Sequence, residues 1–300
     1  MQHLYNYMRH WHLELWLQNG IFFGATTKFD DPCEGHQSER PVHALADAIE
    51  AVSVDLGADS RAMEDAKDKF VKITRDFALA AKKQTFISCW HANSSFSPRM
   101  SATYGEGGVY IRTNPDRIIL ALRTASPKLS QLLKQAPGSG GDIFHQVRYI
   151  DDIDNPESSQ ALDDLLALSF HGNKRTVWEY QREWRLVIDA VEVTARTGIE
   201  INGTRALSRG GEDIAIDPKG LLVVREADGN ATHLYVNADP AILIDEVGVT
   251  DEALLASTAA LCERFGLPMP RLVTAAERMI IEKEEECASV KRQQEGQLRP

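Results

Sequence analysis

The eight residues Trp178–Arg185, WEYQREWR, run directly into the apolar segment Leu186–Ile188. A short apolar run with alternating flanks predicts a β-strand. Glu183 would lie at the mouth of that strand, two residues after Gln181. Side chains two positions apart on a strand project to the same face, so these two can reach one ligand together. The alternative is an edge strand whose end is solvated by its charged residues.

Outward from this strand, short apolar runs and helical patterns are mixed along the chain. Asp228-Gly229 predicts a hairpin turn, and the polar stretch 91–97 predicts a loop. Strands are expected at 4–8, 21–23, 86–90, 109–111, 144–150, 221–225, 233–236 and 242–249. Helices are expected at 9–18, 42–83, 114–123, 160–170 and 251–265. Strands and helices that do not alternate strictly indicate an α+β fold with a mixed, mainly antiparallel sheet covered by helices.

The chain is expected to form a single domain over residues 1–282, because it shows no internal repeat and no long linker. Within it, residues 42–83 would be a helical insert and residues 220–282 a C-terminal accessory segment. The charged, glutamine-rich residues 283–300 are expected to form a disordered tail.

Composition limits the classes of partner. The 300 residues carry a formal net charge of −11, which argues against nucleic acid or an anionic membrane as a broad electrostatic partner. No stretch approaches the roughly 20 apolar residues of a membrane span. Residues 1–12 lack the basic and apolar regions of a signal peptide, so a cytoplasmic location is expected. The sequence predicts no oligomeric state.

Several chemical motifs are missing from the sequence. The cysteines at 33, 89, 262 and 287 are scattered without a CxxC pair, which predicts neither a metal site nor a disulfide framework. Cys89, on a predicted strand, is expected to be buried and inert. Gly105–Gly108 lacks the spacing of a phosphate-binding loop. Lys174 and Arg175 would either hold a phosphate or form a solvated helix end.

Four patches follow one another in an order that resembles a known family. They are Leu4–Tyr7, Phe29–Glu34, Phe86–Ile111 with its Met100, Tyr104 and glycines, and Lys174–Arg185. The series resembles a widespread bacterial family, domain of unknown function 2971, over roughly residues 4–275. That resemblance implies no established activity.

The layout also resembles the ADP-ribosyltransferase fold, a split mixed sheet that binds NAD in a cleft. The resemblance implies that an early, a middle and a late strand contact NAD. These roles fall on Tyr5, Asn6 and Tyr7 for the early strand, on Ser88 with the stacking ring of Tyr104 for the middle strand, and on Gln181, Glu183 and Arg185 for the late strand. Asn6 stands where such enzymes often carry histidine, and Gln181 where glutamate is common.

The function implied by this resemblance is an NAD-dependent ADP-ribosyltransferase or NAD glycohydrolase of the toxin or phage-defence type. NAD would be the substrate, the acceptor is unknown, and no metal is needed. Glu183 would stabilise the positive charge that develops on the ribose, and Gln181 would orient the acceptor. The alternative is a non-catalytic nucleotide- or protein-binding module, in which Arg185 bridges to Glu183 and Trp178 belongs to the core. A nuclease is disfavoured by the acidic charge and by the lack of a compact carboxylate set.

Overall fold

The computed structural model describes residues 2–29, 46–47, 50, 60–106, 108–125, 129–135, 143–150, 173–203 and 220–297. Residues 30–34 of the patch Phe29–Glu34, most of the first part of the predicted helical insert (42–59) and the predicted helix at 160–170 lie outside the described residues.

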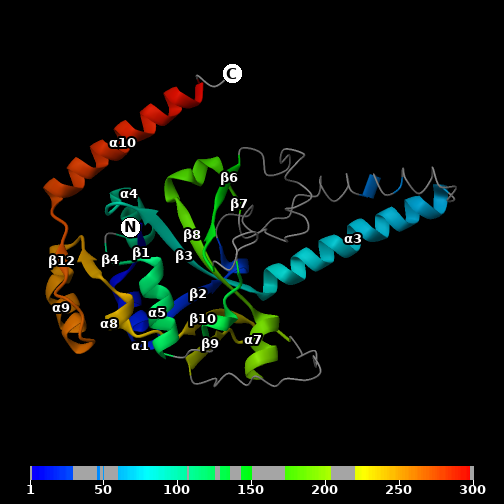
Figure 1. The fold of residues 1–300 in the computed structure, drawn as a ribbon, viewed down its shortest axis with the longest axis horizontal. Helices are drawn as coiled ribbons and strands as arrows, with labels where there is room; N and C mark the ends of the chain where they lie inside the picture. The colour runs from blue at the N-terminus through cyan, green and yellow to red at the C-terminus, as the bar shows by residue number, and fades with distance from the viewer. Residues whose placement is uncertain are drawn as a thin grey trace.

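The described residues form a ten-stranded sheet in the order β12-β11-β4-β1-β3-β2-β10-β9, with β8 paired to β3 and β5 paired to β8 (Figure 1). β11 and β12 run parallel, whereas the other pairs in this sheet are antiparallel. The fold is therefore α+β with a mainly antiparallel sheet, as the sequence predicts. The strands are β1 (His3–Met8), β2 (Ile21–Ala25), β3 (Thr85–Asn93), β4 (Val109–Thr113), β5 (His145–Gln146), β8 (Glu183–Asp189), β9 (Leu221–Arg225), β10 (Ala231–Val236), β11 (Glu246–Val249) and β12 (Arg271–Leu272).

The sheet divides into two arms at β3. One edge of β3 pairs with β8 from Thr85 to His91. On the other edge, β1 pairs with residues 91–93 and β2 pairs with residues 86–87. Between these two stretches, Asn6 Nδ2 donates a hydrogen bond to the Cys89 carbonyl oxygen at 2.9 Å. One arm therefore continues from β1 to β12, the other from β2 to β9, and β3 joins them.

The two faces of the sheet differ in chemistry. Alternate side chains of β1, β3, β4 and β8 enter a large apolar core, among them Leu4, Phe86, Ile111 and Leu186. The opposite face carries the tyrosines of a second, smaller buried cluster together with His91 of β3 and Glu183 and Arg185 of β8. A period of two along each strand produces this separation.

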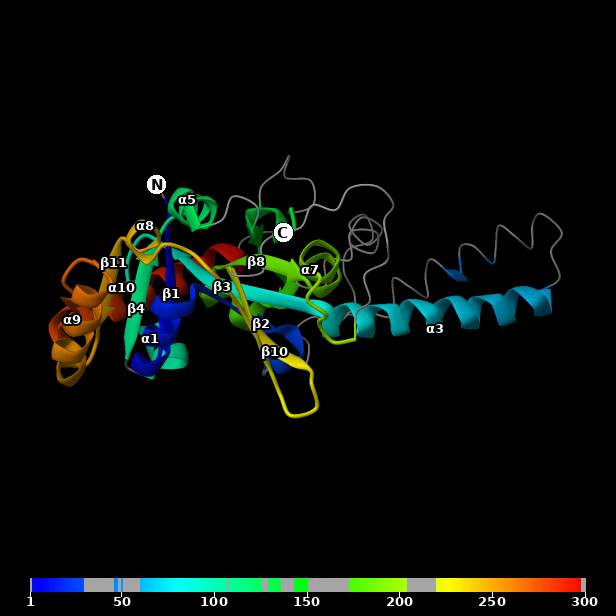
Figure 2. The same ribbon diagram turned by 90° about the horizontal axis from the view of Figure 1, so that it is seen from below.

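Helices cover the apolar face and extend from the sheet. α1 (His10–Asn19) ends at Gly20, whose φ of 99° and whose approach to the Val236 carbonyl exclude a side chain. α3 (Ser60–Gln84) extends away from the sheet (Figures 1 and 2). The other described helices include α4 (Pro98–Met100), α5 (Pro115–Ala125), α7 (Ala190–Thr197), α8 (Pro240–Leu243), α9 (Leu255–Arg264) and α10 (Ala275–Gln297). None of the helices among the described residues is long and apolar enough to cross a membrane.

Three local predictions were wrong. The strand expected at 144–150 is two short strands: β5 belongs to the large sheet, and β6 (Arg148–Ile150) pairs in parallel with β7 (Asn173–Arg175) in a separate two-stranded sheet. The loop expected from residue 91 begins later, because β3 continues to Asn93 through pairing with β1 and β8. The strand expected at 242–249 is preceded by α8, which Asp239 begins by accepting a hydrogen bond from the Ala241 N–H at 2.9 Å. Only the last four residues of that stretch form β11.

The C-terminal third is part of the sheet. Residues 220–282, expected to be an accessory segment, supply β9–β12 and pair with β2 and β4. The segment is therefore integral to the fold. α10 then continues to Gln297, through most of the stretch expected to be disordered.

Candidate functional site

A row of three side chains crosses the polar face where β1, β3 and β8 lie side by side. Tyr5 is the partner of His91 in the β1–β3 register, and His91 is the partner of Glu183 in the β3–β8 register. Residues directly opposite on neighbouring strands share a face, so the three side chains lie in one line across the sheet. All three are buried, at 2%, 3% and 5% exposure respectively.

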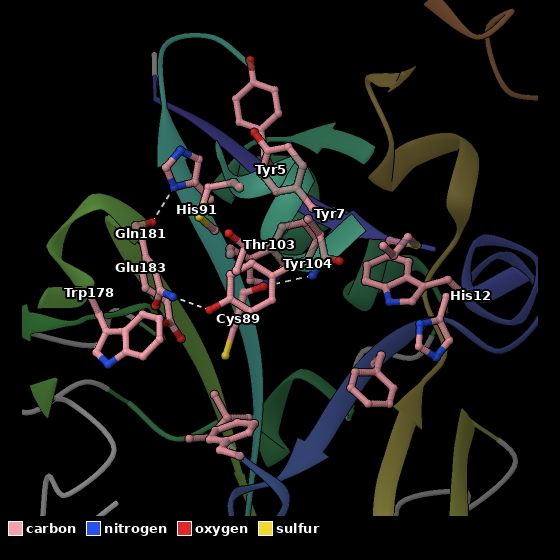
Figure 3. Close-up of a pocket in the computed structure, with 18 of the residues that line it drawn as sticks. Tyr5, Tyr7, His12, Cys89, His91, Thr103, Tyr104, Trp178, Gln181 and Glu183 are labelled. Carbon is pink, nitrogen blue, oxygen red and sulfur yellow. Dashed lines mark hydrogen bonds between the residues drawn. The ribbon is translucent and has the colours of Figure 1, made fainter. Parts of the chain in front are cut away.

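A cavity of about 470 Å³ borders this row at the division of the sheet. Pockets of roughly 300–1,000 Å³ are typical of small-molecule sites. The walls come from β1, α1, β2, the 3₁₀ helix Thr26–Lys28, β3, the α4 region, β7 (Asn173–Arg175), the 3₁₀ helix Thr176–Gln181, β8 and β10. Figure 3 shows Trp178, Gln181 and Glu183 on one side, His12 on the other, and Cys89, Thr103 and Tyr104 between them.

Glu183 is held between two cations. Its Oε1 accepts from Arg185 Nε at 2.6 Å, and its Oε2 accepts from Lys174 Nζ at 2.7 Å. Burial alone would raise the pKa of Glu183, but Arg185 and then Lys174 outweigh it and hold that pKa below its usual value. The carboxylate is therefore ionised at neutral pH and rigidly oriented.

Gln181 reaches the same lysine from outside the strand. The sequence predicted that Gln181 and Glu183 share a strand face, which is wrong, because Gln181 ends a 3₁₀ helix and Arg182 has a left-handed φ of 40°. The Gln181 Oε1 nevertheless accepts from Lys174 Nζ at 2.7 Å, and its Nε2 donates to the Tyr104 hydroxyl. Lys174 therefore connects Gln181 and Glu183, the two side chains that were expected to share a strand face.

His91 is a neutral imidazole in this structure. Burial is the main cause that lowers the pKa of His91 to about 4, and Arg182 lowers it further against the opposing effects of the Gln181 carbonyl and Glu183. Its Nδ1 bonds to the Gln181 backbone carbonyl, so Nδ1 carries the proton and Nε2 is an acceptor. Within the described residues, the buried Nε2 has no hydrogen-bond partner.

The predicted NAD-binding residues divide into two groups. Tyr5, Asn6, Tyr7 and Tyr104 line the cavity, together with the predicted catalytic pair. The other two, Ser88 and Arg185, do not line it. On β3, Ser88 projects to the face opposite Cys89 and His91.

Arg185 is fully buried behind Glu183, and its ion pair with that carboxylate matches the structural bridge that the sequence left open. Ser88 is 1% exposed. Neither side chain is therefore placed to contact a molecule in the cavity.

Three residues of the site were not predicted to lie beside Glu183. Lys174, expected either to hold a phosphate or to form a solvated helix end, lies on β7 and is 6% exposed. His91 was placed in a loop, and Cys89, half-buried in the cavity wall, was expected to be inert. The sequence spacing between Lys174 and Glu183 does not predict their contact, because the 3₁₀ helix Thr176–Gln181 reverses the chain between them.

Aromatic rings surround the polar groups. The Tyr5 and Tyr7 rings stack at 6.1 Å between centroids and are buried. Tyr104 is 45% exposed and offers an accessible ring face in the cavity. Trp178 lines the same end, with Lys174 Nζ 5.9 Å from the centroid of its ring. A planar cationic or neutral ring could therefore stack here beside the carboxylate.

No cluster of three or more histidine, cysteine, aspartate or glutamate side chains suited to a metal occurs among the described residues. Comparisons of the chain with protein-family models, with curated proteins and with solved structures found no match in any of the three. The chemistry of this cavity is therefore the basis for assigning a function.

Proposed function

We propose that the protein is an NAD glycohydrolase or ADP-ribosyltransferase that binds NAD in this cavity, with nicotinamide beside Glu183. The observation that carries the proposal is the row Tyr5–His91–Glu183. An early, a middle and a late strand of the sequence become neighbours, which is the arrangement that the resemblance to ADP-ribosyltransferases implies. The division of the sheet at β3 also supports it, because the cavity lies there.

The reaction breaks the bond between the nicotinamide nitrogen and C1′ of the ribose. The bonding electron pair goes to the ring nitrogen, nicotinamide leaves neutral, and positive charge develops on the ribose. An ionised carboxylate near C1′ stabilises that charge more in the transition state than in the ground state. Water or an acceptor then attacks C1′ and releases a proton.

Each residue at the polar end of the cavity would have its own role in this reaction. Glu183 would supply the negative charge, and Lys174 and Arg185 would fix its orientation before the substrate arrives. The ring of Tyr104 would stack on nicotinamide, and Gln181, bonded to the Tyr104 hydroxyl, would hold that ring and face the acceptor.

The test is nicotinamide release from NAD by the purified protein and by Glu183→Gln. We expect release by the wild type and at least a hundredfold loss in the variant, about 3 kcal/mol of transition-state stabilisation. Tyr104→Leu, on a partly exposed ring, should fold normally and lose part of the rate.

Glu183→Gln removes the carboxylate that Lys174 and Arg185 both bind, so a second variant protects the test from misfolding. Lys174→Gln with Glu183→Gln removes one charge of each sign and keeps the net charge of the cluster. If this folded double variant releases nicotinamide at the wild-type rate, Glu183 is not catalytic. Absence of release by a folded wild-type protein, together with no binding of NAD, would reject the proposal.

A non-catalytic nucleotide-binding module is the second candidate. One observation favours it: both oxygens of Glu183 already accept hydrogen bonds from cations, which reduces the negative charge available to a substrate. Binding of NAD without release of nicotinamide would select this candidate.

A further inference from the structure

The cavity has a second end that the proposed chemistry does not use. Figure 3 places His12 across the cavity from Trp178, Gln181 and Glu183. The residues of this aromatic end come from α1, β2, the segment after β2, and β10. They are His12, Trp16, Phe22, Lys28, Phe29 and Tyr235.

The rings of the aromatic end lie close to one another. The Phe22 centroid is 5.6 Å from that of Tyr235 and 6.3 Å from that of His12. Gly24 lies next to the rings of Phe22 and Phe29: a Cβ there would be 3.3 Å from the Phe22 ring and 3.6 Å from the Phe29 ring. The absence of a side chain at Gly24 therefore lets two rings lie against the strand.

The aromatic end offers little net charge to a ligand. Burial lowers the pKa of His12, helped by Arg9 and His233, so His12 is neutral at pH 7. Lys28, the cation at this end, pairs with Glu226 at 2.7 Å. Neutral aromatic walls recognise planar rings by stacking, whatever hydrogen-bonding groups the ring carries.

The two ends of the cavity together suit one ligand that carries two planar rings. The polar end, formed by Lys174, Gln181 and Glu183 with Tyr104, suits one planar ring next to a sugar. The aromatic end suits a second planar ring. A mononucleotide bound at the polar end would leave the aromatic end unfilled.

We propose that the aromatic end is the subsite for a purine base, so that the cavity selects dinucleotides over mononucleotides. This inference rests on the proposed function only for the orientation, with nicotinamide at Glu183. Phe22 and His12 would be specificity-determining residues, since they stack on the base and take no part in the bond that breaks.

Titration calorimetry with NAD, ADP-ribose, AMP and nicotinamide mononucleotide tests the proposal. We expect Phe22→Leu to weaken NAD, ADP-ribose and AMP by roughly ten- to a hundredfold, as for loss of one base-stacking ring. Nicotinamide mononucleotide should bind both proteins equally. His12→Ala, on a half-buried helix residue, should give the same pattern if Phe22→Leu does not fold.

Leu222→Ala is the control, because Leu222 is 45% exposed on the strand next to β10 and does not line the cavity. It should leave all four affinities unchanged. Equal weakening of NAD and nicotinamide mononucleotide by Phe22→Leu, or no binding of AMP to the wild type, would overturn the subsite.

The two proposals fail separately. AMP binding that depends on Phe22, without nicotinamide release from NAD, would retain the subsite and reject the reaction. Nicotinamide release that is insensitive to Phe22→Leu and to His12→Ala at limiting NAD would retain the reaction and reject the subsite.

Discussion

At the scale of single residues, the site consists of one carboxylate between two cations. Glu183 is 5% exposed, and its two partners are buried with it. Removing one member of a buried ion pair is costly because the remaining charge loses its partner in a medium that solvates it poorly. Comparing the loss of stability when Glu183 or Lys174 is replaced therefore shows how these charges balance.

Glu183→Gln should lower the free energy of unfolding by about 3–5 kcal/mol, because Lys174 and Arg185 both lose an ion pair with its buried carboxylate. Lys174→Met should cost less, since a matched Glu183–Arg185 pair remains. Urea unfolding of both variants measures the difference. An equal cost for the two would contradict this charge balance.

The control is an ion pair of the same length at the surface. Lys28 and Glu226 are also 2.7 Å apart, but their side chains are 52% and 46% exposed. Glu226→Gln should therefore change the free energy of unfolding by less than about 1 kcal/mol.

His91 should make stability depend on pH between about 4 and 6.5. Its pKa is lowered from 6.5 to about 4 in the folded protein, so below pH 6.5 the unfolded chain binds a proton that the folded protein does not. Stability therefore falls as the pH drops through this window, by up to roughly 3 kcal/mol. His91→Gln should remove this dependence, whereas Glu183, whose pKa is also lowered, loses its contribution only at lower pH.

Unfolding in urea at pH 7.5, 6.0 and 4.5 checks the effect of His91. The same loss of stability with pH in wild type and His91→Gln would show that other groups cause it.

Part of the site can be predicted from the sequence. The alternation around Leu186–Ile188 correctly predicted a strand that begins near Glu183, and four of the six predicted NAD-binding residues line the cavity. His91 and Lys174 were missed for a tertiary reason. Each is a polar residue that becomes buried only when another strand supplies its partner, and a single sequence does not contain that pairing.

At the scale of elements, β3 determines where the cavity forms. It pairs with β8 along one edge and with β1 and β2 on successive parts of the other. The apolar periodicity of residues 86–90 predicts that a strand exists. It does not predict which strands flank it, because pairing partners separated by 86 to 90 residues leave no local pattern. The extension of β3 to Asn93 was missed for the same reason.

Asn6 should hold β1 to β3 where the arms separate. Asn6→Asp places a carboxylate against the Cys89 carbonyl oxygen, now 2.9 Å from an amide donor, and should cost about 1–3 kcal/mol. Asn19→Asp is a matched control, since Asn19 Nδ2 donates to the Leu15 carbonyl at the same 2.9 Å in an exposed position. Thermal and urea unfolding should show a cost below about 1 kcal/mol for the control. An equal loss of stability at both positions would mean that the Asn6–Cys89 hydrogen bond contributes no more to stability than the exposed Asn19–Leu15 bond.

At the scale of the whole molecule, the first and the last third of the chain both contribute to one cavity. β1 and α1 belong to the first 20 residues, whereas β10 belongs to the segment expected to be accessory. The hairpin of β9 and β10 was predicted from Asp228-Gly229, but its pairing with β2 was not. The sequence therefore predicted the α+β class and most of the strands, while the division of the sheet follows from long-range register.

The measurement that tests the central claim most directly is nicotinamide release from NAD by the wild type, by the Lys174→Gln/Glu183→Gln variant and by a control, Glu14→Gln. Glu14 forms an exposed ion pair with Arg264 and does not line the cavity. Release by the wild type and by Glu14→Gln, with at least a hundredfold loss in the folded double variant, is the result that we predict. Release by the double variant at the wild-type rate, or no release and no NAD binding by the folded wild type, would contradict the assignment of Glu183 to NAD chemistry.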